Sequence, residues 1–260
     1  MTEPVSPAPS NRRSRSARAA LARRRLRVVL IQIRGMPEAK HHEQRCILEC
    51  TGLAQEQLEP WSVLDQPEIR WHDLSQADAI IIGGSGDHSV TRDYPFTPWL
   101  EEVVQSAVAH RKPLFGICWG HHMLARALGG RVVTDPEREE VGTYEVELTS
   151  EGRDDALFSG FASRFDANLV HHDSIAELPA GFRELAATQG CPLQTIKLDD
   201  APVYGTQFHG EMTPEQLRRR LLMYRGYYLE SDEQTAEVAD QLRPTDEANG
   251  LLRRFLELYT

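Results

Sequence analysis

The chain has 260 residues, with 29 Lys and Arg against 39 Asp and Glu, and 40% of its residues are hydrophobic. This composition excludes collagen-like, disulfide-stapled and wholly disordered proteins. The longest apolar runs, 28–31 and 79–82, are far shorter than the ~20 residues that cross a bilayer. We therefore expect no membrane-spanning segment.

The net charge of -10 is unevenly distributed along the chain. Residues 1–27 carry eight Arg and one Glu, a net charge of +7, which leaves -17 for the remainder. The acidic remainder argues against nucleic acid as a partner, because phosphate binding needs a cationic face. Residues 1–26, rich in Pro, Ser and Arg, are predicted to be a disordered leader. We interpret this leader as an untargeted solvated tail of a cytoplasmic protein or as an overextended start site; a transit peptide and an RNA-contacting arm are the alternatives.

From residue 26 onward, short apolar strands alternate with helices. Strands are predicted over 26–33, 62–65, 78–82, 113–118 and 131–134, and helices over 41–53, 99–111 and 119–130. Thr97 followed by Pro98 predicts the N-cap and first residue of one of these helices. The alternation indicates an α/β fold with a mostly parallel sheet that is covered by helices on both faces.

The pattern changes between residues 144 and 209, where strand-like segments follow one another. These segments are 144–149, 164–172, 182–189, 193–198 and 202–209, and they predict the antiparallel part of a mixed sheet. Thr213 and Pro214 then predict a capped helix over 215–229, and residues 232–258 predict two helices split at Pro244. We expect one α/β domain over 27–230 and a helical extension over 231–260 that packs on it.

The four cysteines, Cys46, Cys50, Cys118 and Cys191, have neither metal-binding nor redox-pair spacing. Without a secretory signal, such cysteines indicate a reducing compartment, where a lone Cys can be a nucleophile. Three His-His pairs, at 41/42, 121/122 and 171/172, also lack the spacing of metal ligands. The sequence therefore predicts no metal and no cofactor.

Cys118 lies between Gly116 and Gly120, where an apolar strand stops and a helix begins. Strand, tight turn, nucleophile and helix make a nucleophile elbow, in which glycines let the strand and the helix approach closely. A thiol at a helix N-terminus also lies at the positive end of the helix dipole, which favours the thiolate form. The alternative is that Cys118 is a small buried hydrophobic residue.

A general base for this nucleophile is available at the end of the last predicted strand. Residues two apart in an extended segment point to the same side, so Glu211 can accept a hydrogen bond from one imidazole nitrogen of His209. The other nitrogen would face Cys118, as in a catalytic triad. The alternative for His209 is a hydrogen-bonded histidine of the core.

A glycine-rich loop, residues 83–87, follows the predicted strand 78–82. The loop has neither the dinucleotide-binding fingerprint nor a Walker lysine, which argues against phosphate binding. Its other use is to present the main-chain N–H of Gly84 to an oxyanion, together with the N–H of Trp119. A plain turn is the alternative.

These motifs, Gly-Ile-Cys-Trp-Gly at 116–120, Gly-Gly-Ser-Gly at 83–86 and Gln-Phe-His-Gly-Glu at 207–211, resemble those of class I glutamine amidotransferases, most closely the amidotransferase domain of GMP synthase. The resemblance implies a flavodoxin-like fold in which Cys118 attacks the side-chain amide of glutamine and releases ammonia, leaving a glutamyl thioester. His209, oriented by Glu211, would shuttle protons, and water would release glutamate. In the family a segment like 170–174 helps to hold glutamine, which makes His171 and Asp173 candidate substrate ligands.

The chain departs from the family pattern at two positions. His122 stands where the family usually has a substrate-binding Gln, and Gly210 stands where Pro separates the catalytic His and Glu. The first departure keeps a second enzyme hypothesis open, a hydrolase of γ-glutamyl amides or peptides with the same triad. A binding or regulatory module without turnover is the third hypothesis. Since no synthetase domain is expected within the 260 residues, a separate synthetase subunit would accept the ammonia.

Overall fold

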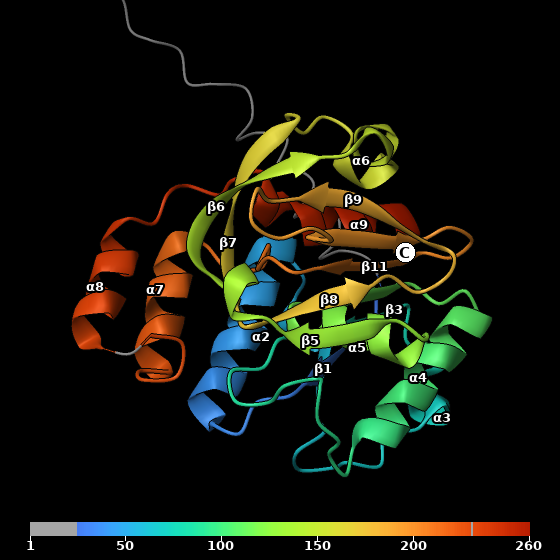
Figure 1. Ribbon diagram of the computed structural model, residues 1–260. Helices are drawn as coiled ribbons and strands as arrows, with labels where there is room; N and C mark the ends of the chain where they lie inside the picture. The colour runs from blue at the N-terminus through green and yellow to red at the C-terminus, as the bar shows by residue number, and fades with distance from the viewer. Residues whose placement is uncertain (1–24, 230) are drawn as a thin grey trace, which may run out of the picture.

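The computed structural model describes residues 25–229 and 231–260. Within them, one sheet has the strand order β2-β1-β3-β4-β11-β10-β9-β6-β7, and β5 pairs with β8 in a small second sheet (Figure 1). The strands are β1 Val28–Gln32, β2 Leu58–Ser62, β3 Ala79–Ile82, β4 Leu114–Ile117, β5 Arg131–Thr134, β6 Glu140–Leu148, β7 Arg164–His171, β8 Asp173–Glu177, β9 Phe182–Ala187, β10 Thr195–Leu198 and β11 Val203–Thr206. The helices are α2 Pro37–Thr51, α3 Trp71–Leu74, α4 Thr97–Ala109, α5 Trp119–Ala127, α6 Ser150–Asp154, α7 Pro214–Met223, α8 Asp232–Asp240 and α9 Leu251–Tyr259.

The sheet has a parallel and an antiparallel half, which confirms the predicted mixed α/β architecture. Strands β2, β1, β3, β4 and β11 pair in parallel. Strands β10, β9, β6 and β7 continue the sheet in antiparallel pairs. Because β3, β4 and β11 are parallel neighbours, their carboxyl ends lie at one edge of the sheet, which is where such folds bind ligands. The three sequence motifs follow these three strands and are thereby brought together.

Helices cover both faces of the sheet, and the strand residues alternate between the two layers. Leu30 belongs to a buried cluster with Phe255 of α9. Its neighbour Ile31 belongs to a second buried cluster with Val103 of α4 and Met123 of α5. Successive residues of a central strand face opposite layers, and both layers are buried. The central strands must therefore be apolar at nearly every position.

Several element boundaries were predicted wrongly. The strand expected at 62–65 is β2, which lies at 58–62, and 63–65 form a turn. As an edge strand, β2 leaves Glu59 and Pro60 exposed, so the apolar pattern did not reveal it. Thr97 is the first residue of α4 rather than its cap, and its Oγ1 accepts a hydrogen bond from the N–H of Tyr94 at 3.0 Å.

The C-terminal helices are present as predicted, with one shorter than expected. Thr213 caps α7 by accepting a hydrogen bond from the N–H of Gln216 at 3.3 Å, but the helix ends at Met223 instead of 229. Helices α7 and α8 pack side by side (Figure 1). Helix α9 is buried against the sheet through Phe255, which contacts the ring of Phe115.

The predicted disordered leader lies outside the described residues except for its last two positions. Of these, Leu26 is buried in the core. No helix among the described residues combines the length and apolar character that crossing a bilayer requires.

Candidate active site

Cys118 occupies a sharp turn between β4 and α5. Its φ is +50°, a conformation that costs a non-glycine residue about 1–3 kcal/mol and recurs at functional sites. The main-chain N–H of Cys118 donates to the carbonyl of Thr206 at 2.7 Å, which ties the turn to β11. A Cβ at Gly116 would lie 2.6 Å from the carbonyl carbon of Gly120, and one at Gly120 would lie 2.2 Å from the carbonyl oxygen of Ile82. Both glycines are therefore required by the close approach of strand and helix.

His209 and Glu211 lie on the loop after β11, and both side chains are buried. The Nδ1–H of His209 donates to Oε1 of Glu211 at 2.8 Å. Burial alone would lower the pKa of His209, but the Glu211 carboxylate and the Cys118 thiol outweigh burial and raise this pKa to about 9. Burial would raise the pKa of Glu211, yet the His209 imidazole reverses that effect and lowers it. The pair thus favours an imidazolium held by a carboxylate.

The two predicted oxyanion donors lie next to the thiol. A Cβ built on Gly84 would lie 3.7 Å from Cβ of Cys118 and 3.1 Å from Cε1 of His209. The N–H of Gly120 donates to the carbonyl of Gly83 at 3.1 Å, which fastens the glycine-rich loop to the start of α5. Among the described residues, the main-chain N–H groups of Gly84 and Trp119 have no backbone hydrogen-bond acceptor, so both could donate to an oxyanion.

A buried ion pair supports the glycine-rich loop from behind. Nε of Arg34 lies 2.9 Å from Oε1 of Glu43, and each side chain is 1% exposed. A Cβ on Gly83 would lie 2.6 Å from Oε1 of Glu43, and one on Gly84 would lie 3.0 Å from Nη2 of Arg34. Burial would lower the pKa of Arg34, but Glu43 more than compensates and raises it. No sequence motif pointed to these two residues, because they lie just after β1 and inside α2.

His122 reaches the nucleophile through Gln207. Burial, the largest influence, lowers the pKa of His122 to about 4, so the imidazole is neutral near pH 7. Its Nε2–H donates to Oε1 of Gln207 at 2.5 Å, and Nε2 of Gln207 in turn donates to Sγ of Cys118 at 3.7 Å. His122 therefore orients the amide of Gln207, a residue that the sequence motif contained but to which no role was assigned.

A cavity of about 360 Å³ opens beside the thiol. Its lining includes Cys118, Trp119, His122 and Asp173. The Asp173 carboxylate accepts hydrogen bonds from Oγ of Ser89 at 2.5 Å and from Oγ1 of Thr134 at 2.6 Å. These two hydroxyls hold an acidic group in the cavity wall, where it could bind an ammonium group.

His171 also contributes to the cavity wall, but its ring is engaged elsewhere. Nδ1 lies 3.0 Å from the carbonyl oxygen of Asp173, and Nε2 lies 3.1 Å from Oε2 of Glu140. Both ring nitrogens therefore have protein partners, and neither is left for a substrate. This geometry argues against the expected role of His171 as a direct substrate ligand.

The sequence matches the family described as glutamine amidotransferase class-I over residues 44–225. A glutamine-hydrolyzing GMP synthase of Vibrio atlanticus is 36% identical over 136 residues, which cover 52% of this chain and 24% of that protein. One subunit of the glutamine-hydrolyzing GMP synthase of Pyrococcus abyssi is 33% identical over 112 residues, covering 43% of this chain and 57% of that one. The matches thus span from about a quarter to just over half of these relatives' lengths.

Solved structures show the same fold over most of the chain. A glutamine amidotransferase of Thermotoga maritima superposes with a TM-score of 0.71 at 21% identity, covering 91% of this chain and 98% of that one. A glutamine amidotransferase of Methylobacillus flagellatus gives a TM-score of 0.67 at 19% identity, covering 90% of this chain and 96% of that one. At this identity the likeness establishes the fold.

Proposed function

Since the chain belongs to the class I glutamine amidotransferases, we propose that it hydrolyses the side-chain amide of glutamine with Cys118, His209 and Glu211 as its catalytic triad. The observation that carries the proposal is the geometry of the elbow. Cys118 has a positive φ and lies between two glycines that the close approach of strand and helix requires. His209 donates a hydrogen bond to Glu211, and the Cys118 thiol is near enough to raise the pKa of its imidazole. A fold kept only for binding would not need this strained turn, which argues against the non-catalytic hypothesis.

The first step forms a thioester. The Cys118 thiolate attacks the carbonyl carbon of the substrate amide, and the carbonyl oxygen becomes an oxyanion. The main-chain N–H groups of Gly84 and Trp119 are placed to stabilise this charge, an effect worth about 3–4 kcal/mol for one well-placed donor. The His209 imidazolium then donates a proton to the nitrogen, the C–N bond breaks, and ammonia leaves.

The second step releases the acid. Neutral His209 takes a proton from water, which attacks the thioester carbonyl and expels the Cys118 thiolate. Glutamate is the product when glutamine is the substrate. Glu211 holds the imidazole in one orientation throughout and stabilises its charged form, as a third triad member does.

Residues of the cavity wall are proposed to recognise the α-amino end of the substrate. Asp173 is proposed to bind the α-amino group, because its carboxylate is held there by Ser89 and Thr134. His122 is proposed to act on specificity by fixing the Gln207 amide beside the thiol, rather than by a direct bond to glutamine.

A γ-glutamyl amide or peptide is the second candidate substrate. The cavity of about 360 Å³ falls in the range of about 300–1,000 Å³ typical of pockets for drug-sized ligands, which leaves room for a substituent on the amide nitrogen. The chemistry is unchanged, with an amine leaving in place of ammonia.

The ammonia is proposed to be consumed by a separate synthetase subunit. The support is that the Pyrococcus abyssi relative is described as one subunit of a glutamine-hydrolyzing GMP synthase. Co-purification would identify the partner of this chain, and a glutaminase rate that rises when the partner is added would support the proposal.

A glutaminase assay tests the proposal. The unmodified protein is expected to convert glutamine or a γ-glutamyl amide into glutamate, and Cys118→Ala is expected to abolish this conversion. Cys46→Ala, which changes another buried cysteine, serves as the matched control and should keep the activity. Activity that survives in Cys118→Ala would refute the nucleophile, and no hydrolysis of either substrate by the unmodified protein would refute the enzyme.

A further inference from the structure

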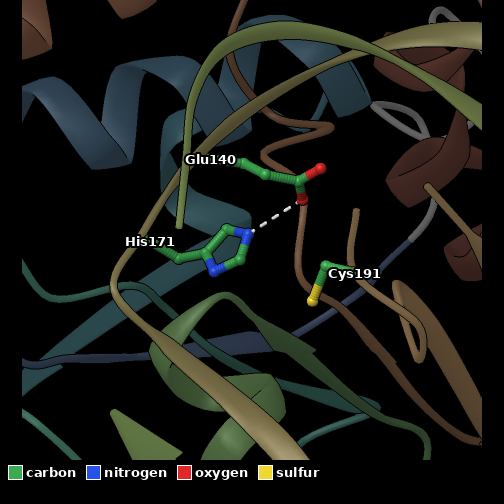
Figure 2. A group of neighbouring side chains, drawn as sticks. All are labelled: Glu140, His171 and Cys191. Carbon is green, nitrogen blue, oxygen red and sulfur yellow. Dashed lines mark hydrogen bonds and ion pairs between the residues drawn. The ribbon is translucent and has the colours of Figure 1, made fainter. Parts of the chain in front are cut away.

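Glu140, His171 and Cys191 form a buried cluster that the proposed hydrolysis does not use. Figure 2 shows the three side chains close together, from the start of β6, the end of β7 and the loop between β9 and β10. One carboxylate oxygen, one imidazole nitrogen and one sulfur lie within 4.8 Å of one another. The residues are only 4%, 3% and 2% exposed, so this is an interior group of potential metal ligands.

The hydrogen bonds of His171 leave a place for a cation. The carbonyl oxygen of Asp173 can only accept, so Nδ1 of His171, 3.0 Å away, carries a hydrogen. In the neutral imidazole, Nε2 then presents a lone pair to Oε2 of Glu140 at 3.1 Å, which is also an acceptor. Two facing acceptors need a positive charge between them, either a proton or a metal ion. A histidine whose other nitrogen donates to a carbonyl is the usual form of a metal ligand.

The carboxylate of Glu140 is positioned by a second layer of polar groups. Oγ1 of Thr188 donates to Oε1 at 2.6 Å, and Nε2 of Gln194 donates to Oε2 at 2.7 Å. The amide oxygen of Gln194 is fully buried and has no hydrogen-bond partner among the described residues. A proton between His171 and Glu140 would leave this oxygen without a partner, whereas a metal ion would give it one. The Cys191 thiol donates to the carbonyl oxygen of Pro192 at 3.4 Å, and a metal-thiolate bond would replace this hydrogen bond.

One member of the cluster borders a surface groove. Glu140 lines this groove together with Thr188 and Gly190, and the groove carries five Glu and three Arg. Gln189 and Gly190, next to Cys191 in its loop, are exposed. With bonds of about 2.0–2.3 Å, tetrahedral zinc holds its ligand atoms about 3.3–3.8 Å apart, so the longest edge must shorten by about 1 Å. Movement of the surface loop that carries Cys191 can supply this.

We propose that Glu140, His171 and Cys191 bind a divalent cation of the zinc class. The carboxylate and the Nε2 lone pair bind as they are, the Cys191 thiol releases its proton to solvent, and water or the Gln194 amide oxygen takes the fourth position. One nitrogen, one sulfur and one oxygen ligand favour zinc over magnesium or calcium, which prefer oxygen alone.

Cobalt(II) is the probe for this site, because a cobalt-thiolate bond gives an intense charge-transfer absorption. The experiment uses Cys118→Ala protein, which removes the catalytic thiol as a competing ligand, after treatment with a chelator. One equivalent of Co²⁺ is expected to produce the thiolate band, and Zn²⁺ is expected to displace it. In that background Cys191→Ser should abolish the band and weaken Zn²⁺ binding at least about tenfold, whereas Cys46→Ser, the matched control, should keep both.

Two results would overturn the proposal. Failure of the Cys118→Ala protein to bind one equivalent of Co²⁺ with a thiolate band would do so, because this protein keeps all three proposed ligands. Persistence of the band in Cys191→Ser would assign it to another cysteine. Thr188→Ala leaves all three ligands in place and is expected to lower Zn²⁺ affinity about 10–100-fold through the loss of its bond to Glu140.

Discussion

The described part of the chain holds two groups that each consist of a Cys, a His and a Glu, and their geometry differs. In the first group, His209 donates to Glu211 and the Cys118 thiol is close enough to raise the pKa of the imidazole. In the second group, Glu140 is the centre, because it accepts from Thr188 and Gln194 and faces His171. The first arrangement is suited to proton transfer, and the second places several lone pairs close together.

The cysteines of the two groups, Cys118 and Cys191, also differ in their surroundings. Cys118 lies on a strained turn at the start of a helix, beside the main-chain N–H groups of Gly84 and Trp119. Cys191 lies in a hairpin loop, where burial, reinforced by Glu140, raises the pKa of its thiol to about 12. We therefore propose that an identical set of residue types serves nucleophilic catalysis in one place and metal binding in the other, depending on which atoms face each other.

The largest effect is expected from removal of His209, the proposed general acid and base. His209→Asn should lower kcat for glutamate formation about 10³-fold, because no group remains to protonate the leaving nitrogen. His72→Asn is a suitable control, since that side chain is 95% exposed. A kcat within tenfold of the unmodified protein would remove His209 from the triad.

The next largest effect is expected at Glu211, which is proposed to orient His209 without transferring a proton itself. Glu211→Gln should lower kcat about 10²-fold and move the alkaline limb of the kcat/KM profile to lower pH. The sign follows from the pKa of His209, raised to about 9 in part by Glu211, so the imidazolium form is lost as pH rises through that value. Without the Glu211 carboxylate, the imidazolium form is lost at a lower pH. Glu215→Gln, a nearby exposed carboxylate, is the control, and an unmoved alkaline limb in Glu211→Gln would contradict the assignment.

The elbow itself can be broken by one methyl group. Gly120→Ala places a Cβ where the carbonyl oxygen of Ile82 lies 2.2 Å away, so we expect a loss of about 1–3 kcal/mol in the free energy of unfolding. Gly250→Ala meets nothing nearer than 3.6 Å and should change stability little. Equal denaturant midpoints for the two variants would show that the close approach is not required.

The smallest effect concerns specificity. His122→Gln restores the residue usual in the family and alters the hydrogen bond that orients Gln207. We expect the ratio of kcat/KM for glutamine to that for a γ-glutamyl amide to rise about tenfold, the scale of one such interaction. The control is His41→Gln at an exposed position, and an unchanged ratio would separate His122 from substrate choice.

The positions of the proposed triad residues could be predicted because their signals are local. A Gly-x-Cys-x-Gly turn and a His-x-Glu segment each fix their own geometry, and the neighbouring parallel strands β4 and β11 bring them together. The same reasoning placed Gly84 correctly beside the thiol. It did not reveal the partners of His171, because no pattern in the sequence shows that Glu140 lies opposite its Nε2.

The second group was invisible in the sequence for a related reason. Its members come from β6, β7 and the loop before β10, so no ligand spacing exists to be recognised. The buried pair of Arg34 and Glu43 escaped for the same cause, since only tertiary packing brings the end of β1 against α2. Edge strand β2 was misplaced because exposed Glu59 and Pro60 interrupt its apolar pattern.

The cysteine that forms the covalent intermediate can be identified by labelling, and its identity decides whether the elbow is the catalytic centre. An electrophilic glutamine analogue should modify one residue per chain, mapped by mass spectrometry of peptides, and we expect this residue to be Cys118. Excess glutamine should protect it, and His209→Asn should slow the labelling. Modification of Cys191 or Cys46 in place of Cys118 would refute the proposed mechanism.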